Sequence, residues 1–178
     1  MKRLSLAIAV TIGAGLATPA GAQQSMHLGI AGGAVFPVGK LDSTYTSGPS
    51  GLVTLALGSQ DAPVGLRLDY QYDGFKGRTI GGVTGRNIHI NSVTANIVVP
   101  FRAGYLKPYI IGGAGLYPVR LPGTTKRERD WGANGGVGIG FPLPYTNIGA
   151  FIEARYHNVN RPNASSYHFV PVTFGLLF

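Results

Sequence analysis

A two-residue periodicity of apolar side chains constrains the fold more than any other feature of the sequence. In residues 64–72 every even position holds an apolar or aromatic residue, and every odd position holds glycine or a polar residue. This alternation is typical of a β-strand with one apolar and one polar face. It recurs in 132–142, 147–158 and 166–178, so the sequence predicts an all-β protein.

Turn signals between such stretches predict the number of strands. We expect eight, at residues 26–37, 51–59, 63–73, 88–101, 107–118, 132–142, 147–158 and 166–178. Long connections (38–50, 74–87, 119–131 and 159–165) alternate with short turns near Gln60, Ala103 and Tyr145. An up-and-down antiparallel transmembrane barrel has this arrangement, with tight turns on one side of the membrane and longer loops on the other.

Two positions interrupt the pattern. The apolar parity of the fourth strand changes between Ile90 and Val93, which indicates either a bulge or a strand whose outer part leaves the membrane. Pro171 cannot donate a ladder hydrogen bond, so we expect a bulge there or a position above the hydrocarbon.

The composition of the polar face decides which face meets lipid. Only 12% of the residues are charged, against the usual quarter of a soluble domain. A soluble lipocalin-like barrel, the alternative, turns its apolar residues inward around a ligand and its polar residues outward. Here the polar face carries charged residues on the third and seventh strands and is elsewhere largely Gly and Asn, a composition too sparse in charge for a water-facing exterior. We therefore expect the apolar face to meet lipid.

Aromatic residues near the predicted strand ends match the two interfacial girdles of a membrane barrel. Towards the long loops they are Phe36, Tyr72, Tyr117, Tyr156 and Tyr167, and towards the turns they are Phe101, Tyr105, Phe141, Tyr145 and Phe178.

Residues 1–22 are interpreted as a cleaved signal peptide. A basic start at Lys2 and Arg3 precedes a short apolar segment and the small-residue pattern Ala20-Gly21-Ala22. The apolar segment is too short to span a bilayer as a helix. We therefore expect one domain, residues 23–178, in an exported chain.

The C-terminal segment Val172-Thr173-Phe174-Gly175-Leu176-Leu177-Phe178, with the export signal, is similar to that of the small outer-membrane β-barrel family, the OmpA-like and OmpX-like eight-stranded proteins. Gly33–Gly39, Gly112–Gly115 and Glu153–Tyr156 also resemble that family. The resemblance implies a transmembrane barrel in the bacterial outer membrane, reached after export through the inner membrane. It also implies periplasmic chaperones during insertion, and a signal for the barrel-assembly machinery formed by Val172, Phe174, Leu176 and Phe178.

The third and seventh strands place charges opposite each other across the interior. The predicted interior polar network consists of Arg67, Asp69, Gln71, Glu153 and Arg155. Its two positive and two negative charges cancel, and an eight-stranded interior is just wide enough for side chains to fill it. We expect ion pairs that act as a structural core, with a narrow conduit and catalysis as the alternatives.

Motifs for catalysis, cofactors or metals are weak. The sequence has no cysteine, which excludes a thiolate site, and its four histidines have no tight metal-ligand spacing. A lipid A deacylase barrel would need Ser where Val159 follows His157. The amphipathic helix of a palmitoyltransferase barrel has no room before the first strand. Residues 135–140 lack the Gly-Lys-Ser/Thr of a phosphate-binding loop. We predict no catalytic, cofactor-binding or metal-ligating residue.

The predicted outer loops are basic. Two of them carry more basic than acidic residues and so have a net positive charge. One contains Lys76, Arg78 and Arg86 against Asp73, and the other contains Arg120, Lys126, Arg127 and Arg129 against Glu128 and Asp130. Lipopolysaccharide phosphates are the nearest anions, and ordinary solvated loops are the alternative. No nucleic-acid-binding module is visible.

These features predict a monomeric, non-enzymatic outer-membrane barrel in contact with lipid, with a polar interior filled by side chains. Envelope integrity or surface interaction through the loops is the expected role. A narrow channel or lateral transporter for small or hydrophobic solutes is the alternative, and a lipid A-modifying enzyme is the third hypothesis.

Overall fold

The structure, a computed structural model, describes residues 25–58, 63–101, 104–120, 128–161 and 165–178. Within these ranges the chain is almost entirely antiparallel β-strand, and the single helical element is the short 3-10 helix η1 (Gly39–Leu41). None of the helical structure in these ranges is long and apolar enough to cross a membrane. The predicted signal peptide lies outside the described residues.

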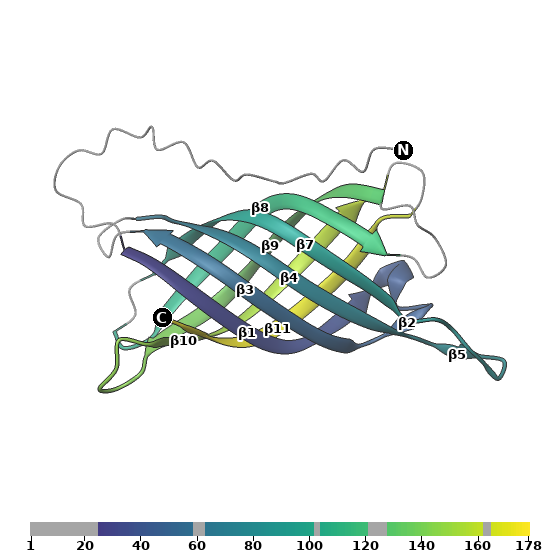
Figure 1. Cartoon of the computed structure of the whole chain (residues 1–178), viewed down its shortest axis with the longest axis horizontal. Coiled ribbons are helices and arrows are strands. Elements are labelled where there is room, and N and C mark those ends of the chain that lie inside the picture. The colour runs from purple at the N-terminus through teal and green to yellow at the C-terminus, as the bar shows by residue number, and fades with distance from the viewer. Residues whose placement is uncertain (1–24, 59–62, 102–103, 121–127, 162–164) are drawn as a thin grey trace, which may run out of the picture.

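Eight long strands of the described chain form one closed barrel (Figure 1). Their order around the sheet is β4-β3-β1-β11-β10-β9-β8-β7, and pairing of β4 with β7 closes the ring. The strands are β1 (Ser25–Val38), β3 (Gly48–Gly58), β4 (Gly65–Gly77), β7 (Ile88–Pro100), β8 (Lys107–Arg120), β9 (Glu128–Pro142), β10 (Gly149–Asn160) and β11 (Tyr167–Leu177). The predicted eight-stranded up-and-down barrel is therefore confirmed.

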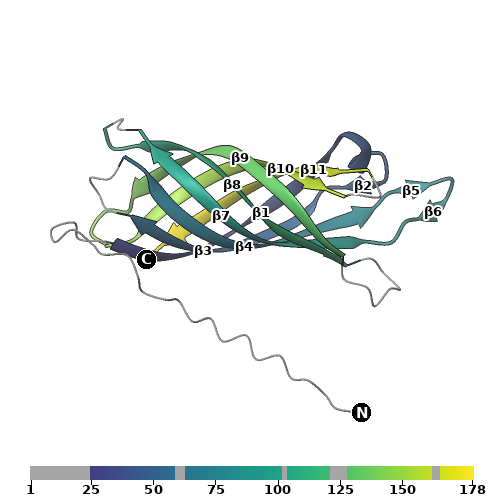
Figure 2. The same cartoon turned by 90° about the horizontal axis from the view of Figure 1, so that it is seen from above.

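The two ends of the barrel differ (Figure 2). At what we call the turn end lie the strand ends at Gly58, Gly65, Pro100 and Lys107 and the connection 143–148, together with Ser25 and Phe178. At the opposite, loop end lie η1 and the short strands β2 (Tyr45–Thr46), β5 (Thr79–Ile80) and β6 (Val83–Thr84). Here the barrel strands run further than predicted, because β9 pairs with β8 from Glu128 and β4 pairs with β7 as far as Phe75. The long connections are correspondingly shorter than expected.

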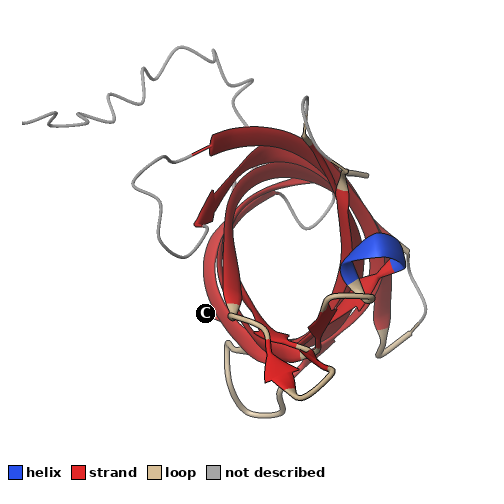
Figure 3. Cartoon of the chain, turned by 90° about the vertical axis from the view of Figure 1, so that its right-hand side faces the viewer, coloured by secondary structure: helices blue, strands red, loops and turns tan. Residues whose placement is uncertain are grey.

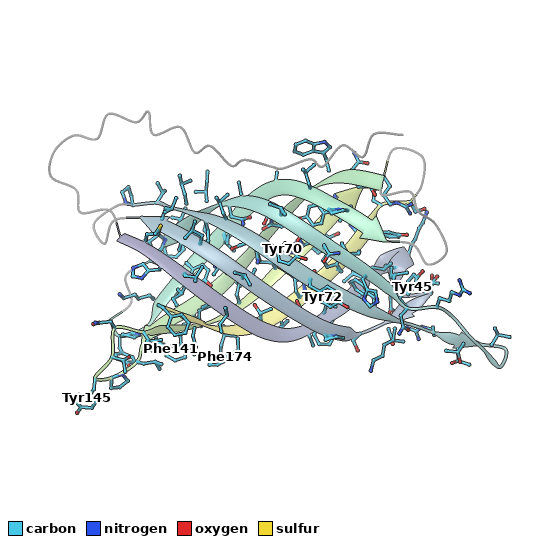
Figure 4. All side chains as sticks on the ribbon, viewed as in Figure 1. Tyr45, Tyr70, Tyr72, Phe141, Tyr145 and Phe174 are labelled. Carbon is cyan, nitrogen blue, oxygen red and sulfur yellow. The ribbon has the colours of Figure 1, made fainter. Side chains whose placement is uncertain are left out.

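Along β4 the two faces of the barrel alternate as predicted. On β4 the side chains of Leu66, Leu68 and Tyr70 are about half exposed, whereas those of Arg67 and Asp69 are buried. Exposed apolar and aromatic side chains cover the outside of the barrel (Figure 4). Viewed along the barrel axis, the strands form a closed ring (Figure 3). The buried side chains of these strands face the interior of the ring.

The fourth predicted strand, β7, has no bulge. Its register with β4 is continuous from Val98 to Ile88. Ile88 and Ile90 point inward and are fully buried, whereas Val93 and Ile97 point outward. The apolar parity changes because the inward face itself becomes apolar at the loop end, a pattern that a rule of polar interior against apolar exterior cannot anticipate.

Pro171 also causes no bulge. It is buried in β11 opposite Val35 of β1, and the register of β11 with both β1 and β10 is the same before and after it. The strand accommodates the proline without an inserted residue, so the first of the two expected outcomes is wrong.

Candidate functional site

The interior of the barrel brings together the charged residues of β4 and β10. These strands are not neighbours in the sheet, so contacts between them cross the barrel. The five side chains of the predicted interior network are at most 5% exposed, and they are Arg67, Asp69, Gln71, Glu153 and Arg155.

Arg67 binds Glu153 across the barrel through two parallel hydrogen bonds. Its two terminal nitrogens donate to the two Glu153 oxygens at 2.8 Å each. Its Nε also donates to Asp69 Oδ1 at 3.0 Å. Paired donation from a guanidinium to a carboxylate is a strong and directional form of ion pair.

Arg155 of β10 contacts the same two carboxylates as Arg67. Its NH1 donates to Asp69 Oδ2 at 2.8 Å, and its Nε lies 2.9 Å from Glu153 Oε1. Its NH2 donates to Gln71 Oε1 at 3.0 Å. Each arginine therefore contacts both carboxylates, and the four charges form a closed, neutral cluster with no net charge to attract an ion.

Three further side chains join this cluster. The Tyr109 hydroxyl donates to Glu153 Oε2 at 2.7 Å. Asn96 donates to Asp69 Oδ2 at 2.9 Å and accepts from Asn134 at 2.9 Å. The sequence prediction does not include Tyr109, because it draws the network only from the third and seventh strands. It does not include Asn96, because the apolar parity of its strand changes and does not define an inward face.

A glycine makes room for one of these partners. A Cβ on Gly138 would overlap the Tyr109 ring. Absence of a side chain at this inward position therefore lets the tyrosine reach Glu153. Close packing thus explains the glycine at position 138, whereas a Cβ at Gly135 would make only an ordinary van der Waals contact.

Asp73 lies in the interior of the barrel, so the prediction that it belongs to an outer loop is wrong. It is fully buried, accepts a 2.7 Å hydrogen bond from Ser50 and accepts two from Gln71 Nε2 at 3.0 Å. Asp130 is also buried, with its Oδ2 3.4 Å from Arg161 Nε. Strand pairing continues past the predicted loop boundaries, and both residues lie on inward-facing positions of the extended strands.

Above the polar network, at the loop end, the interior becomes apolar. This apolar layer includes Phe75 and Phe169, whose rings meet edge to face at a centroid distance of 5.5 Å. Leu41 of η1 covers the layer from the loop side and is 3% exposed. The buried members of the layer are Val35, Leu41, Phe75, Ile88, Ile90, Tyr117, Val159 and Phe169.

Tyr117 corrects the girdle prediction. It is fully buried in the apolar layer, and its hydroxyl lies 3.0 Å from Nδ1 of His157. The ring of His157 stacks on Phe169 at 4.9 Å. Tyr167 also packs against this layer. Position near a strand end does not show whether an aromatic ring points inward or outward.

The outward-facing aromatics include two tyrosines that pair with histidines. The Tyr72 hydroxyl lies 2.6 Å from His89 Nδ1, and the Tyr156 hydroxyl lies 2.7 Å from His168 Nδ1. Each pair of rings is also stacked. Among the described residues, no group of three or more His, Asp or Glu side chains is arranged to hold a metal ion.

The basic loop residues fall into two groups. Lys76, Arg78 and Arg86 are exposed at the loop end, where Arg78 pairs with Asp42 at 2.9 Å. Burial raises the pKa of the Tyr45 hydroxyl in the same loop region, and the nearby Tyr167 raises it further, whereas Arg161 lowers it. Of the second predicted cluster, Lys126 and Arg127 lie outside the described residues, and for Arg120 and Arg129 only the strand positions are described.

The C-terminal segment closes the barrel against its first strand. Phe178 and Leu28 exchange backbone hydrogen bonds of 2.8 Å and 3.2 Å. Val172, Phe174 and Phe178 are exposed on the outer face, and Leu176, on the same face, is partly exposed.

The sequence and the fold were compared with those of known proteins. Residues 6–178 match the family described as the outer membrane protein beta-barrel domain. The fold is similar to Neisserial surface protein A, with 14% identity and a TM-score of 0.64 over 86% of this chain and 97% of that one. It is also similar to the outer membrane protein Ail of Yersinia pestis, with 17% identity and a TM-score of 0.50 over 86% of this chain and 100% of that one. No curated protein matches the chain.

Proposed function

The chain belongs to the outer membrane protein β-barrel domain family and is a protein of the bacterial outer membrane, and we propose that it is a non-enzymatic barrel with a closed, filled interior. Its role is in envelope integrity or in surface interaction through the loops. In such barrels the short turns face the periplasm and the longer loops face the exterior. The turn end is accordingly periplasmic and the loop end extracellular.

The observation that carries this proposal is the neutral cluster of Arg67, Asp69, Glu153 and Arg155 in the middle of the barrel. A conduit for ions needs charges that water or a passing ion can reach, whereas here every charge of the cluster is paired with two others. Removing one partner of a buried ion pair costs about 3–5 kcal/mol because the other charge is left uncompensated, so the paired arrangement of the cluster is strongly favoured. The apolar layer adds a second closure above it.

The same contacts argue against catalysis. A carboxylate that acts as a general base or nucleophile needs a free lone pair directed at substrate. Glu153 and Asp69 instead direct their oxygens at the two arginines. Val159, where a deacylase-like motif would need serine, is fully buried in the apolar layer. These contacts support a structural role for the interior.

The exposed basic residues at the loop end are the candidates for surface interaction. Lys76 and Arg86 have no ion-pair partner among the described residues, unlike Arg78. Phosphates of the outer leaflet, lipopolysaccharide above all, are suitable anions for them. The double change Lys76→Gln with Arg86→Gln should weaken binding to diphosphorylated lipopolysaccharide vesicles, and have much less effect with a dephosphorylated form. Equal loss with both vesicles would contradict phosphate recognition.

We further infer that the chain acts as a monomer and that its C-terminal segment is read by the barrel-assembly machinery. The exposed apolar row of Val172, Phe174 and Phe178 supports the second inference, because lipid-facing side chains at alternate positions are available for recognition before the barrel closes.

Conductance in a planar bilayer tests the closed interior. We expect purified wild-type protein to insert without reproducible single-channel steps. A heat-dependent shift of the same sample on a denaturing gel would verify that the inserted protein is a folded barrel. Reproducible steps from folded wild-type protein would overturn the proposal and favour the channel alternative.

A further inference from the structure

The periplasmic end of the barrel interior holds a cavity that the closed-barrel role does not use. Its volume is about 260 Å³, close to the lower limit for small-molecule sites. It lies between residues of all eight barrel strands near the turn end and is lined mainly by apolar atoms. The inward-facing side chains that matter most here are Ala56, Val98, Phe151 and Leu177.

The floor of this cavity carries no free charge. Arg67 reaches it, but the guanidinium is held by Glu153 and Asp69 and lies over the Phe151 ring at 5.8 Å from its centroid. The hydroxyl of Tyr109 is likewise committed to Glu153. An apolar group entering the cavity therefore meets aliphatic and aromatic carbon and a neutral, satisfied polar layer.

The mouth of the cavity carries the free positive charge. Lys107, the first residue of β8, is exposed, and its ammonium group has no hydrogen-bond or ion-pair partner among the described residues. His27 lies on the same rim, with Nδ1 3.3 Å from the Phe178 carbonyl oxygen. A second hollow of about 540 Å³ shares Lys107 and His27 with the first and continues along the turn at 146–149.

We propose that this vestibule binds one acyl chain of an anionic amphiphile, with the chain in the apolar cavity and the anionic group at Lys107. The position supports this ligand class, because the proposed function puts the turn end on the periplasmic side, where the mouth borders the inner leaflet with its acyl chains and anionic groups. A neutral polar solute would leave its hydrogen bonds unmade on the apolar lining. A free long-chain carboxylate and an inner-leaflet phosphodiester lipid share the required chemistry.

The experiment uses the folded full-length barrel in lipid nanodiscs and follows the Ala56 methyl group by NMR. Decanoate is the first probe, and lysophosphatidylglycerol is the second. We expect a saturable shift of the Ala56 signal, while the signal of Ala133, which faces the lipid, changes only in proportion to the probe added. Saturation with decanoate alone identifies a free carboxylate, and saturation with the lysolipid alone identifies a phospholipid.

Two variants test the geometry. Ala56→Trp should abolish the saturable response of the Leu177 methyl groups, because the indole fills the cavity, whereas Ala133→Trp on the outer face should leave that response intact. Lys107→Gln should weaken binding about two- to fivefold, as expected for loss of one exposed charge pair. Lys76→Gln, at the other end of the barrel, is the matched charge control.

A readout on the wild-type protein keeps the proposal testable even where a variant does not fold. A doxyl label near the methyl end of the fatty acid should broaden the Ala56 and Phe151 signals before those of Lys107. Absence of saturable, position-dependent effects with both probes would overturn the proposal. Contacts of the Ala56 methyl group with the chain's own residues 23 and 24 would also overturn it, because that segment would then occupy the cavity.

Discussion

The ion-pair cluster predicts a large effect from a small change at Glu153. This carboxylate accepts two hydrogen bonds from Arg67 and one from Tyr109, and it lies 2.9 Å from the Nε of Arg155. In Glu153→Gln the side chain keeps its size but loses its charge. One of its two oxygens becomes an amide nitrogen, which faces arginine nitrogens that can only donate. One positive charge is then left uncompensated in the interior.

The magnitude follows from burial. Glu153 is 1% exposed and Arg67 is 5% exposed, so water does not screen the unpaired charge. Removing one partner of a buried pair costs about 3–5 kcal/mol. At a urea m-value of about 2 kcal/mol/M, this lowers the unfolding midpoint by roughly 1.5–2.5 M. Replacing Arg67 and Glu153 together by Met and Leu should cost much less, because Arg155 and Asp69 remain paired.

Urea titration of the barrel in lipid vesicles, followed by tryptophan fluorescence and gel mobility, measures these midpoints. Asp42→Asn is the matched control, because it removes one carboxylate from the exposed Arg78 pair and should cost at most about 1 kcal/mol. If Glu153→Gln and Asp42→Asn shift the midpoint equally, the interior cluster is hydrated and the reasoning fails.

Three further outcomes are expected. A nitroxide at Leu68 should be more accessible to oxygen than to a water-soluble nickel chelate, and the reverse order would contradict a lipid-facing position. Gly138→Ala should lower stability by about 1–3 kcal/mol in the same urea titration, since its methyl group overlaps Tyr109, whereas Gly112→Ala, where a Cβ has room, should change little. Deletion of Phe178 should reduce the amount of assembled protein in outer-membrane fractions, and an unchanged yield would contradict the proposed assembly signal.

The parts of the fold that follow from local pattern were predictable. Alternation on 64–72 placed Leu68 and Arg67 on opposite faces, because the side-chain period of a strand is two. The strand number followed from turn signals. The loop-end boundaries were wrong because pairing of Phe75 with Ile88 extends the strands beyond the apolar pattern.

Contacts across the barrel were only partly predictable. The sequence placed Arg67, Asp69, Glu153 and Arg155 on inward faces, but which arginine nitrogen meets which carboxylate depends on the tilt and register of strands far apart in sequence. Tyr109 reaches Glu153 only because Gly138 on a neighbouring strand has no side chain. A single strand's pattern contains no information on such a pairing.

The layers along the barrel axis give its two ends different properties. Apolar side chains, including Leu41, close the loop end, and the neutral cluster closes the middle of the barrel. A molecule in the vestibule at the turn end therefore has no open path through the interior. A bound acyl chain would enter and leave through the same mouth beside Lys107. Such a site retains a ligand but does not move it across the membrane. Acyl binding and conductance are therefore independent properties: Ala56→Trp, which fills the vestibule, should abolish acyl binding and leave conductance unchanged.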